Sequence, residues 1–208
     1  MADLALTQRP ALAGILVPGR HGRPDGPPGL VVRERSHLAL VSIMARKGQG
    51  ESLAALVKSA YGIELPTSPR LAGGPMPDGR SISFIWSGSD LWLAYAEGAA
   101  GLERELAMAL GKRAMIVDQS DGRCVLNLSG PRVRSTLAKG LGIDLHARVL
   151  KPGDVALTMA AHIAVQLWQL DDKPTFEIAM FRSLAGSFWS WLSASAAEFG
   201  YDAVEDRR

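Results

Sequence analysis

The chain has 208 residues, of which 47% are hydrophobic, and its formal net charge is +2. That length allows one large domain or two small ones, and the small net charge argues against a nucleic-acid-binding protein although the sequence pI of about 8.8 is basic. Apolar runs stay below the roughly 18 residues of a membrane span, and the N-terminus has no signal-peptide pattern, so the expected protein is cytoplasmic with no membrane partner.

Residues 1–36 differ in composition from the rest of the chain. Residues 14–29 are dense in glycine and proline, and such a segment does not nucleate a helix or a sheet by itself. We therefore expect residues 1–36 to form an extended N-terminal segment. Its arginines either contact an acidic partner or belong to a solvated tail, and the sequence leaves both interpretations open.

Residues 37–118 show hydrophobic patterns of both helical and strand period. The expected elements are a strand at 38–45, a helix that ends at Gly62, strands at 82–86 and 91–95, a helix from Leu102 that ends at Gly111, and a strand at 114–118. The order β-α-β-β-α-β is that of a ferredoxin-like unit, which has an antiparallel sheet with two helices on one face. The sequence therefore predicts such a unit over 37–118.

Residues 119–201 predict a second α+β unit of similar size. The expected elements are a strand at 123–129, a short helix at 132–139, strands at about 155–159, 162–169 and 175–181, and a helix that begins at a Ser183 cap and ends at Gly200. Leu184, Phe188, Leu192, Ala196 and Phe199 form the expected buried stripe of that helix, and residues 202–208 form a tail. The predicted fold class is α+β, with two ferredoxin-like (split βαβ) type units and antiparallel sheets.

A polar corner separates the two predicted units. Asp118, Ser120 and Asp121 lie between two strand-like runs, and Asp121-Gly122 is typical of a tight turn. These side chains could satisfy their own backbone, bind a ligand, or fix the units against each other; we favour the structural junction. Cys124 follows in the apolar set of the next strand, and a lone cysteine excludes an intrachain disulfide and fits a reducing compartment.

The sequence lacks the motifs of a cofactor-binding or metal-binding enzyme. No G-x-G-x-x-G follows a predicted strand, so we expect no dinucleotide on this chain. The four histidines are scattered and there is one cysteine, a combination that disfavours zinc. We predict no catalytic residue and no metal site.

Two short stretches around the polar corner resemble a known family. Residues 118–123 (DQSDGR) and 128–132 (LSGPR) are similar to the gamma subunit of heterotetrameric sarcosine oxidase. Matching pieces follow at 137–140, 144–146, 152–153, 161–162, 167–168, 174–177, 182–183 and 187–192. No single piece is specific, but the ordered set is, and the resemblance extends over about Val31 to Tyr201.

The resemblance implies a fold related to the folate-binding part of glycine-cleavage aminomethyltransferases. It also implies partners, namely the alpha, beta and delta subunits of a complex that demethylates sarcosine oxidatively to glycine, formaldehyde and hydrogen peroxide. With tetrahydrofolate present, that complex makes methylenetetrahydrofolate. FAD, FMN, NAD, zinc and tetrahydrofolate are then expected on the other subunits, and no catalytic residue is carried over to this one. Self-association of the free chain is left open by the sequence.

Asp144 carries the alternative hypothesis of a stand-alone, folate-binding, aminomethyltransferase-like protein. Its place after a helix is similar to that of an aspartate in aminomethyltransferases, where a carboxylate could hold a pterin or act on a proton. Ile143 stands where that family has asparagine, which weakens the analogy. The competing interpretation is a loop carboxylate that caps a turn or pairs with Arg148.

Five side chains are candidates for a partner interface. Trp189 lies off the predicted stripe of its helix, and Trp92 faces opposite Leu91 and Leu93 on its strand. Exposed tryptophan and arginine are typical interface anchors, so we predict an interface that includes Trp92, Trp189, Arg123, Arg132 and Arg182. The alternative is that both faces of each sheet are covered within the chain.

Overall fold

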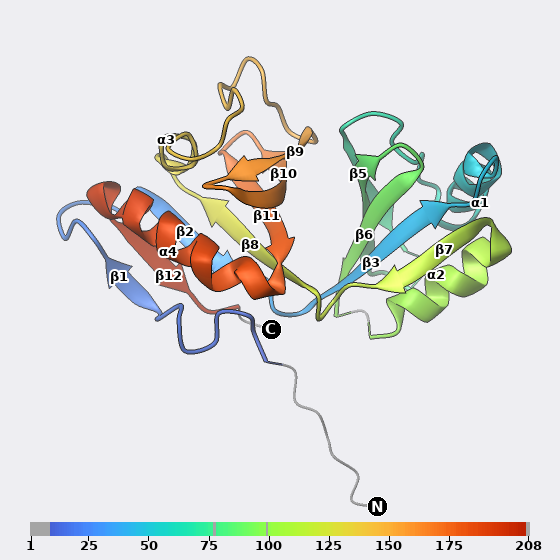
Figure 1. The fold of residues 1–208 in the computed structure, drawn as a ribbon, viewed down its shortest axis with the longest axis horizontal. Coiled ribbons are helices and arrows are strands. Elements are labelled where there is room, and N and C mark those ends of the chain that lie inside the picture. The colour runs from blue at the N-terminus through green and yellow to red at the C-terminus, as the bar shows by residue number, and fades with distance from the viewer. Residues whose placement is uncertain (1–8, 77, 99, 207–208) are drawn as a thin grey trace, which may run out of the picture.

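The protein forms two α+β units side by side, in a computed structural model that describes residues 9–76, 78–98 and 100–206 (Figure 1). The first unit contains β3 (Leu38–Ala45), α1 (Gly50–Tyr61), β4 (Leu71–Pro75), β5 (Ser81–Gly88), β6 (Leu91–Glu97), α2 (Leu102–Leu110), a 3₁₀ turn η1 (Gly111–Arg113) and β7 (Ala114–Asp118). Within the described residues its sheet order is β4-β5-β6-β3-β7. Omitting β4 leaves the ferredoxin-like order, with β3 between β6 and β7 and antiparallel to both.

Both helices of the first unit form where the sequence predicts them. Leu53, Val57 and Tyr61 of α1 recur at helical spacing and are buried, and Gly62 ends the helix with a left-handed φ of 69°. In α2, Leu102, Leu106 and Leu110 are buried in the same way. Most of the predicted stripe of each helix therefore packs against the sheet, whereas Ala60, expected on the inner face of α1, is exposed.

The second unit repeats this element order and adds strands to it. It contains β8 (Arg123–Ser129), α3 (Val133–Leu137), β9 (Val155–Ala160), β10 (Ile163–Asp171), β11 (Thr175–Phe181), a 3₁₀ turn η2 (Arg182–Leu184), α4 (Ala185–Ala196), a 3₁₀ turn η3 (Ala197–Phe199) and β12 (Tyr201–Val204), joined by β1 (Gly19–His21) and β2 (Leu30–Glu34). In the described residues the sheet order is β1-β12-β2-β8-β11-β10-β9. The expected α+β class with antiparallel sheets is confirmed, although β2 pairs with β12 in parallel.

The ends of the chain differ from the sequence prediction. Within 9–36, Leu30–Glu34 is an inner strand of the sheet and Leu12 is 1% exposed, so this part is not a free extended segment; residues 1–8 lie outside the described residues. Tyr201–Val204 is a strand and not a tail. The two ends hold each other, because β2 and β12 pair residue by residue. A strand can thus follow a Gly/Pro-rich stretch when the strands that pair with it come from elsewhere in the chain.

The start of the last helix also differs from expectation. Ser183 lies in the 3₁₀ turn η2 and does not cap α4, whose first turn follows Leu184. Leu184 is 37% exposed, whereas Phe188, Leu192 and Ala196 are fully buried. The predicted stripe is therefore correct for Phe188, Leu192 and Ala196, whereas Phe199 is only partly buried and lies in η3, after α4 has ended.

The two units are joined as if by an approximate internal two-fold axis. Equivalent backbone positions exchange hydrogen bonds in reciprocal pairs. Between the units these are Leu71 N to Gly153 O at 2.8 Å and Val155 N to Pro69 O at 3.0 Å. A second equivalent pair, Gln119 N to Leu40 O at 2.7 Å and Arg35 N to Val125 O at 2.8 Å, extends the β3–β7 and β2–β8 ladders within each sheet. Because β7 belongs to one sheet and β8 to the other, the corner at 119–122 is a crossover between units.

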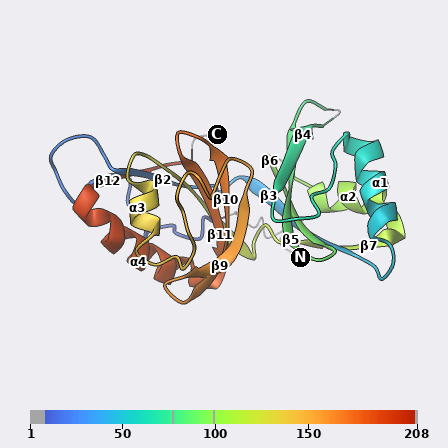
Figure 2. The ribbon, with the colours of Figure 1, turned by 90° about the horizontal axis from the view of Figure 1, so that it is seen from above.

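Helices cover the outer faces of the sheets, and the inner faces meet. In Figure 2, α1 and α2 lie on the side of their sheet away from the second unit, and α4 lies at the opposite end of the molecule. We call the zone where the helix-free faces meet the seam. Its apolar core consists of Leu38, Leu40, Ile85, Leu93, Val125, Val155, Trp168 and Ala179. No helix within the described residues is long and apolar enough to cross a membrane.

Candidate functional site at the seam

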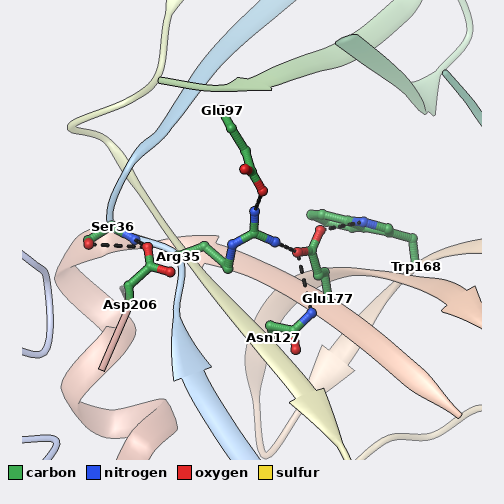
Figure 3. Close-up of polar contacts among 7 residues, drawn as sticks. All are labelled: Arg35, Ser36, Glu97, Asn127, Trp168, Glu177 and Asp206. Atoms are coloured by element: carbon green, nitrogen blue, oxygen red, sulfur yellow. Dashed lines mark hydrogen bonds and ion pairs between the residues drawn. The ribbon is translucent and has the colours of Figure 1, made fainter. Parts of the chain in front are cut away.

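A buried carboxylate, that of Glu177, occupies the second unit's side of the seam. Its side chain on β11 is 0% exposed. It accepts hydrogen bonds from Trp168 Nε1 at 3.0 Å and from Asn127 Nδ2 at 3.5 Å, and it forms an ion pair with Arg35 (Figure 3). Such a charge is tolerated inside a protein only with partners of this kind.

Arg35 joins the two units through this carboxylate. One arm of its guanidinium pairs with Glu177 of the second unit, and the other pairs with Glu97 at the end of β6 in the first unit (Figure 3). The Arg35 side chain is 15% exposed, whereas that of Glu97 is 76% exposed. The pair with Glu177 is therefore the stronger connection, because solvent screens the pair with Glu97.

Burial sets the ionisation of this cluster. It raises the pKa of Glu177 above the ordinary value of 4.5, and Arg35, Asn127 and Trp168 counteract part of that shift. Burial also raises the pKa of Tyr95 to about 12. The Tyr95 ring lies 5.8 Å from that of Trp168, so the aromatic pair spans the seam beside the carboxylate.

Two open hollows adjoin the Arg35 end of the seam. One, of about 870 Å³, is lined by Arg33, Arg35, Glu97 and Asp206 among others. A neighbouring hollow of about 460 Å³ includes Asp118 and Ser120 of the predicted junction. Among the described residues, no three His, Cys, Asp or Glu side chains are grouped so as to hold a metal ion. Arg35 and Glu97 form an ion pair here, and the Asp206 carboxylate accepts from Ser36 N at 2.8 Å, contacts that are typical of a structural connection.

Comparison with known proteins places this architecture in a family. A model of the "Sarcosine oxidase, gamma subunit family" matches residues 47–198. This chain belongs to the sarcosine oxidase gamma subunit family. The gamma subunit of Corynebacterium sp. (strain P-1) is 32% identical over 174 residues, 83% of each chain, and that of Arthrobacter sp is 32% identical over 145 residues, 69% of each.

Solved structures agree with the family. A chain of the heterotetrameric sarcosine oxidase from Corynebacterium sp. U-96 has a TM-score of 0.71 and 29% identity, with 82% of this chain and 85% of that chain covered. Aminomethyltransferase T of the glycine cleavage system from Bartonella henselae has a TM-score of 0.62 and 15% identity over 85% of this chain and 48% of that one. The second match concerns the fold alone and confirms the expected likeness to the aminomethyltransferase fold.

In this gamma-family chain the two candidate tryptophans are buried, and their predicted exposure is wrong. Trp92 is 6% exposed and donates to Pro66 O at 2.8 Å, and Trp189 is 7% exposed with its ring edge against Tyr201. Trp92 faces the helix side of its sheet, while Leu93 faces the seam. Both faces of this sheet are covered within the chain, which was the alternative interpretation.

The three candidate arginines contact their own chain. Arg123 lies over the Phe181 ring at 4.2 Å; burial lowers its pKa, and its Nε has no hydrogen-bond partner among the described residues. Arg132 lies over the ring of Phe199 at 5.6 Å, and Arg182 donates to Arg9 O at 2.5 Å. Arg123 lies at the seam, and Arg182, whose backbone N–H donates to Gly122 O at 3.0 Å, lies beside it in space; Arg132 lies beside η3.

The junction residues fix the crossover. Ser120 Oγ accepts from Leu40 N at 3.1 Å, and Asp118 Oδ1 accepts from Ser120 N at 2.8 Å and from Ser120 Oγ at 2.6 Å. These contacts hold the corner against β3. Asp121 is exposed and has no side-chain hydrogen bond within the described part of the chain. Asp118 and Ser120 thus lie together at the junction, and Asp121 does not join them.

Asp144 lies in the loop between α3 and β9, away from the seam. It is exposed, and its Oδ1 accepts from His146 N at 2.8 Å, which is a turn-capping contact. No ion pair between Asp144 and Arg148 is found in the described structure. A folate-binding role for Asp144 remains a prediction.

Sequence reasoning missed the seam cluster. Glu177 interrupts the apolar run of β11, and a glutamate amid buried strand residues signals a paired buried charge. Its partner Arg35 belongs to the segment 1–36, which composition alone assigns to an extended arm. Local sequence patterns therefore could not indicate that Arg35 pairs with Glu177.

Cys124 provides a test of the buried second unit. It is 2% exposed, and burial raises the pKa of its thiol. We expect iodoacetamide to alkylate native protein at least about 100-fold more slowly than urea-unfolded protein, because only the accessible thiolate reacts. Mass spectrometry of the labelled chain measures both rates, and equal rates would contradict this placement.

Proposed function

We propose that this chain is the gamma subunit of a heterotetrameric sarcosine oxidase, in which it is an accessory subunit without catalytic residues of its own. The observation that carries the proposal is the agreement of sequence and fold along most of the chain, with 29% identity and a TM-score of 0.71 to a chain of such an enzyme. The family match over residues 47–198 supports it independently.

The assembled enzyme would oxidise the C–N bond of the sarcosine N-methyl group. Sarcosine, dioxygen and water then give glycine, formaldehyde and hydrogen peroxide, and tetrahydrofolate accepts the one-carbon unit when it is present. We propose that the alpha and beta subunits supply FAD, FMN and NAD, that delta supplies zinc, and that folate binds outside this chain. This placement is supported by two features: the sequence has no dinucleotide-binding glycine loop, and no cluster of metal ligands is found among the described residues.

The contribution of this chain would be mechanical. The Arg35–Glu177 pair, the apolar core of the seam and the reciprocal backbone bonds make the two units one body. A body of this kind presents a fixed surface, and binding to a fixed surface avoids the entropic cost of ordering it. The gamma subunit would thereby hold a folate-type domain of a partner in position.

Co-expression with candidate alpha, beta and delta subunits tests this function. We expect the isolated chain to be colourless, because it binds no flavin, and to co-elute with a yellow flavoprotein in size-exclusion chromatography when the partners are present. Absorbance at the flavin bands, together with the masses of the chains in the peak, provides the readout. Elution apart from the flavoprotein would contradict the assignment.

A further inference from the structure

The internal symmetry of the fold gives the seam two equivalent ends that differ in chemistry. The first residue of β3 pairs with the last of β6, as Leu38 with Glu97, and the first residue of β8 pairs with the last of β11, as Arg123 with Phe181. At the first end, Glu97 is ion-paired with Arg35. At the other, Phe181 is 48% exposed. Because the equivalent backbone position at the first end carries the charged Glu97, the fold does not require an apolar side chain at the position of Phe181.

Exposed apolar side chains from both units surround the Phe181 end. We call the following set the apolar mouth: Met44, Met115, Val117, Leu157, Met159 and Phe181, each between 41% and 52% exposed. A hollow of about 160 Å³ connects its two sides, with Ser42 and Leu91 from the first unit and Leu157 and Phe181 from the second in its lining. Met44 is opposite both Leu91 and Met115 in the sheet, so the surface is continuous.

The edge strand β7 borders this mouth and is open to pairing. Its sequence, AMIVD, has no proline or glycine, whereas the other edge of the same sheet, β4, is LAGGP. Proline and glycine protect an edge, and an unprotected apolar edge is a template for a further strand. The β3–β7 ladder includes Arg46 N to Arg113 O and Gln119 N to Leu40 O. The antiparallel alternation therefore directs the backbone N–H of Ile116 outward.

Charge identifies what would cover this edge. Arg46, Lys47, Lys112 and Arg113 are exposed and gather where β3 and β7 meet, beside Met44 and Met115. No ion pair involves any of the four within the described residues, although eight such pairs occur elsewhere in that part. A segment that pairs with β7 would bring its own end against this basic group, and acidic side chains there would complement it.

We propose that an extended segment of a partner subunit, apolar in its centre and acidic at one end, adds to the free edge of β7 and covers the apolar mouth. This inference rests on the proposed function, because the partner is another chain of the sarcosine oxidase assembly. Backbone hydrogen bonds to β7 give affinity, and the mouth selects apolar side chains, as in other cases of strand addition. The basic group fixes the direction of the segment.

Binding of purified variants to a gamma-free preparation of the other subunits tests the proposal. Met115→Asp/Val117→Asp places charges in the mouth, and we expect the dissociation constant to rise at least about 30-fold, as for loss of a hot spot. The matched control is Met108→Asp on α2, a residue 74% exposed on the opposite face of the unit, with an expected change below about 2-fold. Lys112→Glu/Arg113→Glu changes only exposed side chains and should weaken binding and reduce its salt dependence.

The backbone contribution has its own pair of variants. Ile116→Pro removes the outward backbone N–H. Ile116→Ala removes a similar amount of side-chain packing but keeps that N–H. Proline at an outward-facing edge position is compatible with the strand, so we expect the proline variant to fold and to bind at least about 10-fold more weakly than the alanine variant. Circular dichroism of each free variant checks the fold.

The outcomes separate the two proposals. If wild-type chain does not bind the other subunits, the proposed function fails. If wild-type binds and the mouth, charge and proline variants bind equally well, only the docking site is wrong. If sedimentation shows that the free chain dimerises through β7, and the same variants abolish the dimer without affecting assembly, the occupant is a second copy and the proposal is overturned.

Discussion

Replacement of Arg35 by alanine should reduce the free energy of unfolding by about 3–5 kcal/mol, because it leaves a buried carboxylate without its ion-pair partner. Glu177 is 0% exposed, and Arg35 provides the positive charge that faces it. Urea unfolding followed by circular dichroism measures the loss. The matched control is Arg80→Ala, which breaks two partly exposed pairs, with Asp78 and Glu105, and should cost about 1 kcal/mol or less.

A second substitution and the pH dependence make this prediction specific. Glu177→Gln in the Arg35→Ala background should restore part of the lost stability, since the remaining amide carries no charge. Burial raises the pKa of Glu177, so between pH 4.5 and its folded pKa the folded state binds more protons than the unfolded state. The contribution of Glu177 to stability is present below pH 4.5 and is lost as pH rises through the folded pKa. Removing Arg35 raises that pKa further, so the deficit of Arg35→Ala should be larger at pH 8 than at pH 5, and an equal deficit would contradict the assignment.

Replacement of Trp168 by alanine should cost about 3–5 kcal/mol, the usual range for a large aromatic side chain removed from a core. Trp168 is 0% exposed and is among the largest fully buried side chains of the described chain. It belongs to the apolar core of the seam together with Leu40 and Leu93 of the first unit, and its Nε1–H donates to Glu177. The loss would therefore combine a cavity with a weakened carboxylate site.

Trp168→Phe separates these two effects. It keeps an aromatic ring beside Tyr95 but removes the N–H donor, and we expect a loss of about 1–3 kcal/mol. Since Trp168 contacts both units, Trp168→Ala should shift the unfolding of both together. Hydrogen exchange in β6 and in β11 reports on each unit, and an effect confined to β11 would argue against a seam that couples them.

Local sequence patterns predicted the elements well and their surroundings less well. The stripes of α1 and α2 and the strands β3, β5, β6 and β7 follow from periodicity, because each helix covers one face of one sheet. The edge strand β4 was expected to be part of a loop, because LAGGP lacks a strand pattern. Trp92 was wrongly predicted to be exposed, because a local pattern does not show what covers each face of a sheet. Alternation shows which residues share a face, and here Leu93 on the opposite face is buried as well, against the other unit.

Long-range pairing explains what the sequence could not indicate. Leu30–Glu34 is apolar enough for a strand, but its place between β8 and β12 depends on residues about 100 and 170 positions away in the chain. The Arg35–Glu177 pair depends on the same arrangement. Family resemblance identified the family to which this chain belongs, and the structure was needed to find the seam and its apolar mouth.

Hydrogen exchange at β7 provides the most direct measurement of the central claim, which is that this subunit acts by docking. The amide of Ile116 faces the free edge, so it should exchange readily in the isolated chain and become protected when the other subunits bind. Peptides that cover Ala114–Asp118 should show this change, and peptides that cover α2 should show none. Unchanged exchange across β7 in the assembled complex would contradict the account.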